Sequence, residues 1–422
     1  MLRAALRIPS RWGAALLLPL ALVASAPPAA AQPAPAPAPR GPVVAGAFRF
    51  DPRRYTPAVL RLSVTTPAGG QGKTLVDLTL IPPYGPPAGR RVEVDTAVLG
   101  GELRRLYVQV ARQEPMAPED PSSPARRLYR VLLAPVQDEL DRHGVTTLLI
   151  SADAGLQAVP FAALHDGSRF VGERYALAVT PSLRLTPLRV PSAGGGSRQL
   201  AAGASHFEGL APLPLVPQEL ERVERGRQGQ RFLDASFTPD VLLELASDPQ
   251  VGRVHVATHA EFLPGGPDQA RLYTGTGPIG LADFAALRNR RRGAPPLDLF
   301  TLSACRTALG DSDSELGFAG LALQAGARSA IGTLWYVDDV ATSAFFVQFY
   351  RYLEQGLPKA EALQATRMAM ASGLLRLEGD RVVGPDGSTL LAGLGIAERR
   401  RIAGGLQHPY YWGGITLLGV PW

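Results

Sequence analysis

The sequence predicts an α/β fold in which helices sandwich a parallel-dominated central sheet, preceded by a small β-rich region. Two patterns carry this prediction. From residue 125 to residue 422, short apolar runs of strand length alternate with longer helical patterns, as in sheets whose parallel strands are buried on both faces. Earlier in the chain, residues 59–64 and 75–81 alternate apolar with polar side chains, which is typical of half-buried strands.

The first 31 residues predict a signal peptide. They combine three arginines, an apolar run at residues 13–24 and small residues at 29–31, where a leader would be cut. The apolar run is shorter than the ~20 residues that span a bilayer, which favours a cleaved leader over an uncleaved anchor. We therefore expect an exported bacterial protein, periplasmic or extracellular, with no stable membrane span once residues 1–31 are removed.

The composition limits the kinds of binding partner and of cross-link that the protein can have. The chain is globular in composition, with 46% hydrophobic and 19% charged residues. Its formal net charge is +6, and it falls to +3 without Arg3, Arg7 and Arg11 of the leader. That charge does not favour nucleic acid as a partner. Cys305 is the only cysteine, so an internal disulfide is excluded and the fold rests on its core.

The region before residue 125 divides into three parts. Residues 32–42 are rich in Pro and Ala and predict an extended linker. Residues 43–112 predict the β-rich region, with a hairpin between its two alternating runs. The Gly-Lys-Thr at residues 72–74 is no phosphate-binding loop, because Pro67 stands where that motif needs glycine and a strand pattern follows. Residues 113–124 predict a second linker.

The remaining elements follow from periodicity and from helix start and stop signals. Buried strands are predicted at residues 145–150, 200–202, 254–258, 297–302, 330–334 and 415–420. Helices are predicted at residues 124–142, 217–227, 238–246, 315–325, 340–355 and 359–370. Three glycines at residues 194–196 predict a joint that divides this region into two halves.

Two of these strands end at residues that carry chemistry. His259 follows the run at 254–258, and Cys305 follows the run at 297–302. In an open α/β sheet, ligand sites form outside the carboxyl ends of the strands. If the two strands are neighbours, about 5 Å apart, the side chains can approach across a substrate. A thiol near an imidazole can ionise and act as a nucleophile.

Other interpretations of these residues remain open on spacing alone. A lone cysteine is more often a small buried hydrophobe than a nucleophile. His255 and His259 lie ~13 Å apart on a strand, so a shared metal is not expected, and His255 is assigned to the core. His143, His165 and His206 lie near turns without a partner pattern. No Gly-x-Ser-x-Gly motif supports a serine nucleophile, and no metal or organic cofactor is expected.

Several motifs give residues 125–422 a resemblance to the CHAT domain, a caspase-like module of bacterial proteins related to separase and the caspases. The matching segments are residues 125–135, 157–166, 175–182, 259–262 (HAEF), 302–307 (LSACRT), 326–339 (GARSAIGTLWYVDD) and 408–412 (HPYYW). The histidine and cysteine segments resemble the catalytic motifs of the family. The resemblance implies a caspase–haemoglobinase fold, with a non-catalytic half at residues 125–235 and a catalytic half at residues 236–422.

The resemblance also implies a mechanism. Cys305 and His259 would form a catalytic dyad that cleaves protein substrates, and the backbone N–H groups of Cys305 and Ala260 would stabilise the oxyanion. Related peptidases usually have glycine after the histidine, but Ala260 still offers its N–H. The similar Leu-Trp segment of separase implies that Asp338 or Asp339 binds a basic substrate residue, with the other capping a helix near residue 340.

The sequence therefore predicts an exported, caspase-like cysteine endopeptidase that cleaves after a basic residue. The alternative is a catalytically idle CHAT-type module that binds, signals or serves as a scaffold in the cell envelope. In either case, residues 43–112 are the candidate surface for a protein partner in the envelope.

Overall fold

The structure is a computed structural model. It describes residues 55–65, 72–153, 155–180, 183, 186, 198–225, 228–262, 270–290, 295–304 and 317–422. The predicted signal peptide, the Pro/Ala linker and Cys305 lie outside these residues. No helix within the described ranges is long and apolar enough to cross a membrane.

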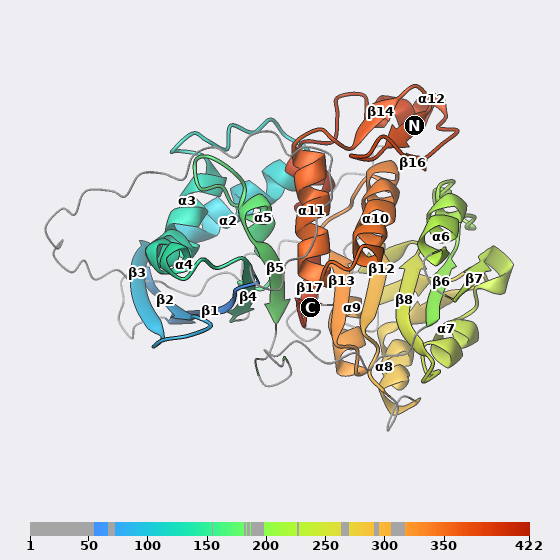
Figure 1. Cartoon of the computed structure of the whole chain (residues 1–422), viewed down its shortest axis with the longest axis horizontal. Helices are drawn as coiled ribbons and strands as arrows, with labels where there is room; N and C mark the ends of the chain where they lie inside the picture. The colour runs from blue at the N-terminus through green and yellow to red at the C-terminus, as the bar shows by residue number, and fades with distance from the viewer. Residues whose placement is uncertain are drawn as a thin grey trace, which may run out of the picture.

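A sheet of eleven strands organises the molecule, in the order β3-β2-β1-β4-β5-β17-β13-β12-β8-β6-β7 (Figure 1). The strands are β1 (Pro57–Thr65), β2 (Lys73–Ile81), β3 (Ala88–Asp95), β4 (Thr147–Ala152), β5 (Ala176–Thr180), β6 (Arg198–Gly203), β7 (Gly229–Leu233), β8 (Val251–Ala257), β12 (Leu299–Ser303), β13 (Ser329–Thr333) and β17 (Ile415–Gly419). The run from β7 through β6, β8 and β12 to β13 is parallel, as are β1, β4 and β5. This confirms the predicted α/β fold with a mostly parallel sheet.

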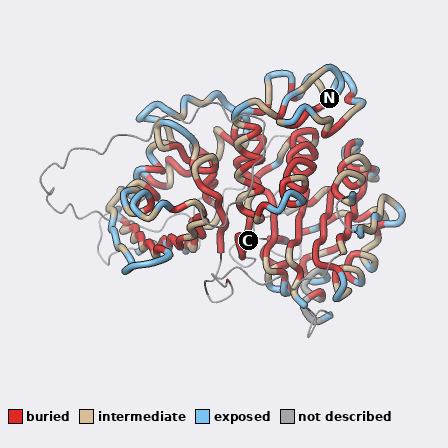
Figure 2. Tube along the Cα trace, in the orientation of Figure 1, coloured by how far each residue is buried: buried red, intermediate tan, exposed pale blue. Residues whose placement is uncertain are grey.

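Helices cover both faces of this sheet, because crossovers between parallel strands are right-handed and the direction along the sheet reverses after β7. On one face, neighbouring helices contact one another in the order α6 (Val216–Glu224), α10 (Asp339–Glu354), α11 (Lys359–Ala371) and α5 (Val171–Arg174). On the other face lie α7 (Pro239–Leu245), α8 (Leu281–Arg290) and α9 (Gly317–Gln324). Figure 2 shows the buried residues concentrated along the strands and the inner sides of the helices.

The strands that precede the predicted site are buried throughout. Every residue of β8, β12 and β13 is buried, which is why each appears in the sequence as a short apolar run. β12 lies between β8 and β13, and its Ser303 is opposite Ala257 of β8. The predicted site required the strand before His259 to neighbour the strand before Cys305, and this condition is met.

The N-terminal strands belong to the same sheet. The predicted hairpin is confirmed by the antiparallel pairing of β1 with β2. β1 also pairs in parallel with β4, with Leu60 opposite Ile150. The prediction of β structure up to residue 112 was wrong for its last part, where α2 (Thr96–Ala111) forms instead. Asp95 caps this helix, and an apolar stripe that includes Leu99, Leu103 and Leu106 is buried.

The single helix predicted at residues 124–142 is interrupted. It divides into α3 (Pro124–Leu132), a 3-10 turn at Ala134–Val136 and α4 (Gln137–Arg142). Pro135 accounts for the break, because proline has no N–H to donate and its ring clashes with the preceding turn of a helix.

The division between the two halves also differs from the prediction. The family resemblance implied a boundary between residues 235 and 236, whereas the glycines at residues 194–196, which lie outside the described residues, indicated an earlier one. However, β6 and β7 lie in the same parallel run as β8, because β6 pairs with β8 from Gln199 opposite Arg253 to Gly203 opposite Ala257. In the sheet, the chain passes from one half to the other between β5 and β6.

Two small sheets complete the fold. β9 (Ala260–Phe262), β10 (Ala270–Tyr273) and β11 (Pro278–Gly280) form an antiparallel sheet directly after His259. β14 (Arg376–Glu378), β15 (Arg381–Val383) and β16 (Thr389–Leu391) form the other, followed by α12 (Ile396–Arg401). In Figure 1, this second sheet and α12 lie above the helices α10 and α6.

Candidate functional site

His259 lies just beyond the carboxyl end of β8 and is half-buried. Its Nε2 lies 2.8 Å from the carbonyl oxygen of Ala211, in the loop between β6 and α6. A carbonyl oxygen only accepts, so Nε2 carries a proton, and in the neutral imidazole Nδ1 then keeps its lone pair. The ring also packs on Phe207 of the same loop, with centroids 4.7 Å apart. The imidazole is therefore oriented as a base that acts through Nδ1.

The neighbouring strand β12 leads towards Cys305. Beyond the paired residues Ser303 and Ala257, the N–H of Thr258 donates to the Ser303 carbonyl at 3.2 Å. The next residue, Ala304, accepts a hydrogen bond from the Thr333 hydroxyl of β13 at 2.8 Å. The end of β12 is thus fixed from both sides. Cys305 follows Ala304 in the sequence and lies outside the described residues.

Ala260 opens β9 and its side chain is buried. The N–H of Tyr273 donates to the His259 carbonyl at 3.0 Å, so these two residues form a hydrogen-bonded pair of the antiparallel ladder. Such pairs alternate with pairs that exchange no hydrogen bonds, and Ala260 opposite Leu272 is the next pair. The N–H of Ala260 therefore points away from β10, as an oxyanion donor on the other side would require.

Asp338 and Asp339 follow β13 and begin α10. The Asp338 side chain caps the helix, accepting from the N–H of Ala341 at 3.0 Å. Its other oxygen lies 2.8 Å from Nε of Arg401 on α12, and Arg401 also pairs with Asp339. The Asp338 side chain is 7% exposed and that of Asp339 22%. Burial raises the pKa of the Asp339 carboxyl, and the adjacent charge of Asp338 adds to this effect.

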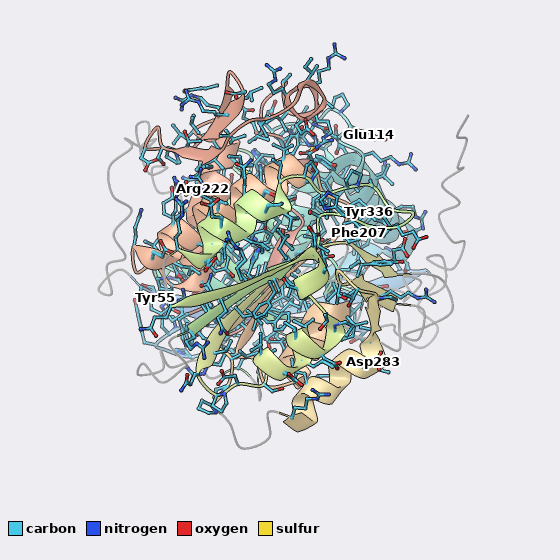
Figure 3. All side chains as sticks on the ribbon, turned by 90° about the vertical axis from the view of Figure 1, so that its right-hand side faces the viewer. Tyr55, Glu114, Phe207, Arg222, Asp283 and Tyr336 are labelled. Carbon is cyan, nitrogen blue, oxygen red and sulfur yellow. The ribbon has the colours of Figure 1, made fainter. Side chains whose placement is uncertain are left out.

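The Leu-Trp segment before these aspartates is anchored in the core. Trp335 is buried, and its ring N–H donates to the carbonyl of Tyr410 at 2.9 Å. Tyr336, the next residue, is 53% exposed. Figure 3 views the molecule from the β7 side and labels both Tyr336 and Phe207, the ring that packs on His259.

Sequence reasoning missed the loop between β6 and α6. Ala211 contributes only a carbonyl group, which every residue has, so no residue type marks it. His206, for which no partner was expected, lies with Nδ1 3.2 Å from Asp234 at the end of β7. His255 is buried as predicted, with Nε2 2.9 Å from Glu219 of α6.

The described residues bring no three His, Cys, Asp or Glu side chains together in an arrangement that could hold a metal ion. The chemistry available at this edge of the sheet is that of an oriented imidazole, backbone N–H donors and carboxylates.

Comparisons with known proteins agree with the fold. The family model described as "CHAT domain" matches residues 122–420. No curated protein sequence matches the chain. Among solved structures, separase from the Saccharomyces cerevisiae separase–securin complex superposes with a TM-score of 0.51 at 10% identity, over 88% of this chain and 30% of that one. The Arg-specific cysteine proteinase gingipain R of Porphyromonas gingivalis gives a TM-score of 0.39 at 10% identity, over 76% of this chain and 74% of that one.

The chain thus spans less than a third of the separase chain that it resembles. At 10% identity, the likeness to separase concerns the fold alone, and it agrees with a caspase-like arrangement of strands and helices.

Proposed function

The chain belongs to the CHAT domain family, and on that premise we propose that it is an exported, caspase-like cysteine endopeptidase with Cys305 as nucleophile and His259 as general base. The observation that carries the proposal is the hydrogen bond from Nε2 of His259 to the carbonyl of Ala211. It leaves Nδ1 as the basic atom, beyond the end of the strand that neighbours β12. In the sequence, Cys305 comes two residues after β12.

In the proposed reaction, Nδ1 of His259 accepts the thiol proton of Cys305, and the thiolate attacks the carbonyl carbon of a substrate peptide bond. The imidazolium then gives this proton to the departing amine, and a thioester remains on Cys305. The same imidazole deprotonates a water molecule that attacks the thioester. Collapse of this adduct releases the carboxylic acid and restores the thiol. Every step is a proton or acyl transfer, so the reaction needs no cofactor.

The backbone N–H groups of Cys305 and Ala260 are the proposed oxyanion donors. The direction of the Ala260 N–H, away from β10, supports this role. In well-studied hydrolases, the loss of one such donor slows the reaction by ~10²–10³-fold.

A basic residue before the cut bond is the proposed specificity. Because Asp338 is committed to capping α10, Asp339 is the carboxylate proposed to meet the substrate. The pairing of Arg401 with both aspartates supports arginine as the substrate residue, since both carboxylates already accept a guanidinium. A substrate arginine would take the place of Arg401 at Asp339.

A catalytically idle module that binds a protein partner is the alternative, and labelling of the thiol separates the two. The purified protein is treated with an electrophilic peptide probe, and the modified residue is identified by mass spectrometry. Since Cys305 is the only cysteine, Cys305→Ala is a complete blank. We expect the wild type to react and His259→Ala to react ~10²–10⁴-fold more slowly, the usual contribution of a general base.

His143→Ala is the matched control. This histidine ends α4 and packs on Tyr84, with centroids 5.0 Å apart. Its loss should leave the labelling rate unchanged. Equal rates in the wild type and His259→Ala would reject the dyad and favour the idle module. Peptide cleavage that survives in Cys305→Ala would reject the cysteine peptidase altogether.

A further inference from the structure

Asp234 has an uncommon backbone conformation next to the candidate site. It follows β7 and has a φ of +49°, in the left-handed region that few residues other than glycine adopt. Its surroundings enforce this geometry. The N–H of Phe237 donates to its carbonyl at 2.8 Å, and a Cβ on Gly275 would lie 1.7 Å from the same oxygen. Strained residues of this kind persist where their surroundings over-determine them, often at functional sites.

The Asp234 carboxylate holds the start of the loop between β6 and α6. Oδ1 accepts from the N–H of Ser205 at 2.6 Å and from the N–H of His206 at 3.3 Å. Oδ2 accepts from the Ser205 hydroxyl at 2.9 Å and lies 3.2 Å from Nδ1 of His206. Ser205 is buried, whereas the His206 side chain is 83% exposed. The carboxylate thus fixes two consecutive residues of the loop through both backbone and side chain.

The same loop makes both contacts that orient His259. Phe207, next to His206, packs on the imidazole, and the carbonyl of Ala211 accepts from Nε2. The N–H of Leu213 donates to the Ser205 carbonyl at 2.9 Å, so the loop is closed on the residue that Asp234 holds. A displacement of Ser205 would therefore move both supports of the imidazole.

We propose that Asp234 is a positioning residue for the dyad. Its carboxylate fixes the loop between β6 and α6 so that the Ala211 carbonyl keeps the proton of His259 on Nε2 and leaves Nδ1 free. Among the described residues, its carboxylate bonds to Ser205 and His206, so it acts on His259 through the loop. Its effect on catalysis rests on the proposed peptidase function, whereas its effect on the tautomer of His259 does not.

The test measures the tautomer and the reactivity separately. The ¹⁵N chemical shifts of the His259 ring are recorded at neutral pH in a Cys305→Ala background, and the labelling rate is measured with Cys305 present. Asp234→Gly removes the carboxylate but accepts the positive φ. Asp234→Asn keeps one acceptor oxygen and also tolerates this φ. Asp386→Gly is the control, because Asp386 also accepts from a serine N–H and hydroxyl, both of Ser388.

We expect a single Nε2–H tautomer in the parent and in Asp386→Gly. In Asp234→Gly, the two ring nitrogens should move towards averaged shifts, and the labelling rate should fall by up to ~10²-fold, the scale of a small displacement of a reacting group. Asp234→Asn should be intermediate in both measurements.

The tautomer tests the positioning role of Asp234, and the labelling rate tests the proposed peptidase function. An unchanged tautomer in Asp234→Gly would overturn the proposal, whatever happens to the rate. If Asp234→Gly fails to fold, an unchanged tautomer in Asp234→Asn together with a wild-type rate would overturn it. A changed tautomer combined with an unreactive thiol in every variant, including the wild type, would support the positioning role and reject the peptidase function.

Discussion

Arg401 lies between the carboxylates of Asp338 and Asp339, and this geometry separates the roles of the two aspartates. Asp338 has one oxygen on the helix cap and the other on Nε of Arg401, and it is nearly inaccessible. Asp339 is more exposed and has Arg401 as its ion-pair partner. Under the proposed specificity, an incoming substrate arginine would compete with Arg401 at Asp339 without unwinding the first turn of α10.

Substitutions of the two aspartates should accordingly have different effects. Asp338→Ala should lower the free energy of unfolding by about 1 kcal/mol, the usual loss for a helix cap. Asp339→Ala should lower the ratio of kcat/KM for an Arg peptide over a matched Leu peptide, with little change in stability. The measurements are denaturant unfolding and turnover of fluorogenic peptides that differ only at the residue before the cut.

Arg399→Ala is the control, because it removes a nearby charge that pairs with neither aspartate. Among the described residues, the Arg399 side chain bonds only to the carbonyl of Gly395, so this variant should keep the wild-type selectivity. If the wild type turns over Asp or Leu peptides as well as the Arg peptide, the basic preference is wrong. If Asp339→Ala keeps the preference, Asp339 is not its source.

Glu361 of α11 makes the stability depend on pH in a defined direction. The residue is half-buried; its Oε2 is buried, and its Oε1 accepts a hydrogen bond from the Thr147 hydroxyl. Burial raises its pKa from 4.5 to about 7. The folded state therefore binds this proton more tightly than the unfolded state. The resulting stabilisation is complete below pH 4.5 and is lost as the pH rises through 7.

The pKa shift of Glu361 corresponds to a loss of about 3 kcal/mol in the free energy of unfolding between pH 4.5 and pH 7. Glu361→Gln mimics the protonated acid, so unfolding midpoints measured from pH 4.5 to 8 should depend less on pH in this variant than in the wild type. Glu378→Gln, at a half-buried glutamate whose side chain is 42% exposed and pairs with Arg376, should keep the wild-type dependence. Parallel curves for Glu361→Gln and the wild type would contradict the prediction.

At the scale of elements, the sequence was most informative where burial is uniform. β4, β8, β12 and β13 were each predicted to within a few residues, because strands buried on both faces form apolar runs. The edge strands β3 and β7 were not predicted. Their sequences, AGRRVEVD and GQRFL, carry the charges that keep sheet edges from pairing with other chains, and those charges hide the strand pattern.

The candidate site likewise has a part that the sequence predicted and a part that it did not. The rule that sites form at the carboxyl ends of parallel strands placed His259 and Cys305 at one edge of the sheet, whereas the adjacency of their strands was only a condition of the predicted site. The supports of the imidazole did not follow from any rule. Ala211 is 48 residues away in the sequence and acts through its backbone, and Asp234 acts through the loop it holds. Contacts of this kind depend on tertiary packing, which one sequence without its fold does not reveal.

At the scale of the whole molecule, the described part of residues 43–112 is continuous with the main sheet and does not form the separate adaptor that the sequence indicated. β1 is hydrogen-bonded to β4 from Pro57 opposite Thr147 to Leu62 opposite Ala152. On its other side it pairs with β2. A protein partner in the envelope would therefore meet β3, the outermost strand on this side of the sheet, or α2. Removal of these strands would expose the edge of β4, so we expect them to be needed for folding.

This continuity constrains where a leader can be cut. Among the described residues, the first strand of the sheet is β1, which begins at Pro57, after the predicted cleavage site at Ala31. We propose that the protein is exported and that the mature chain begins at Gln32. The basis is the basic, apolar and small-residue pattern of the first 31 residues. Replacing Ala29 and Ala31 with arginine should block processing, because the cleavage site requires small residues.

N-terminal sequencing of the protein recovered from the periplasm and the medium tests this prediction. The control is the variant that carries both Ala29→Arg and Ala31→Arg. We expect Gln32 as the first residue of the wild type and an uncut precursor in the variant. An intact N-terminus on wild-type protein in the cytosol would contradict export.

If export occurs, Cys305 works under oxidising conditions and has no cysteine in its own chain to pair with. The proposed peptidase activity should then rise when a reductant is added, because a reductant reverses the first oxidation step of a thiol.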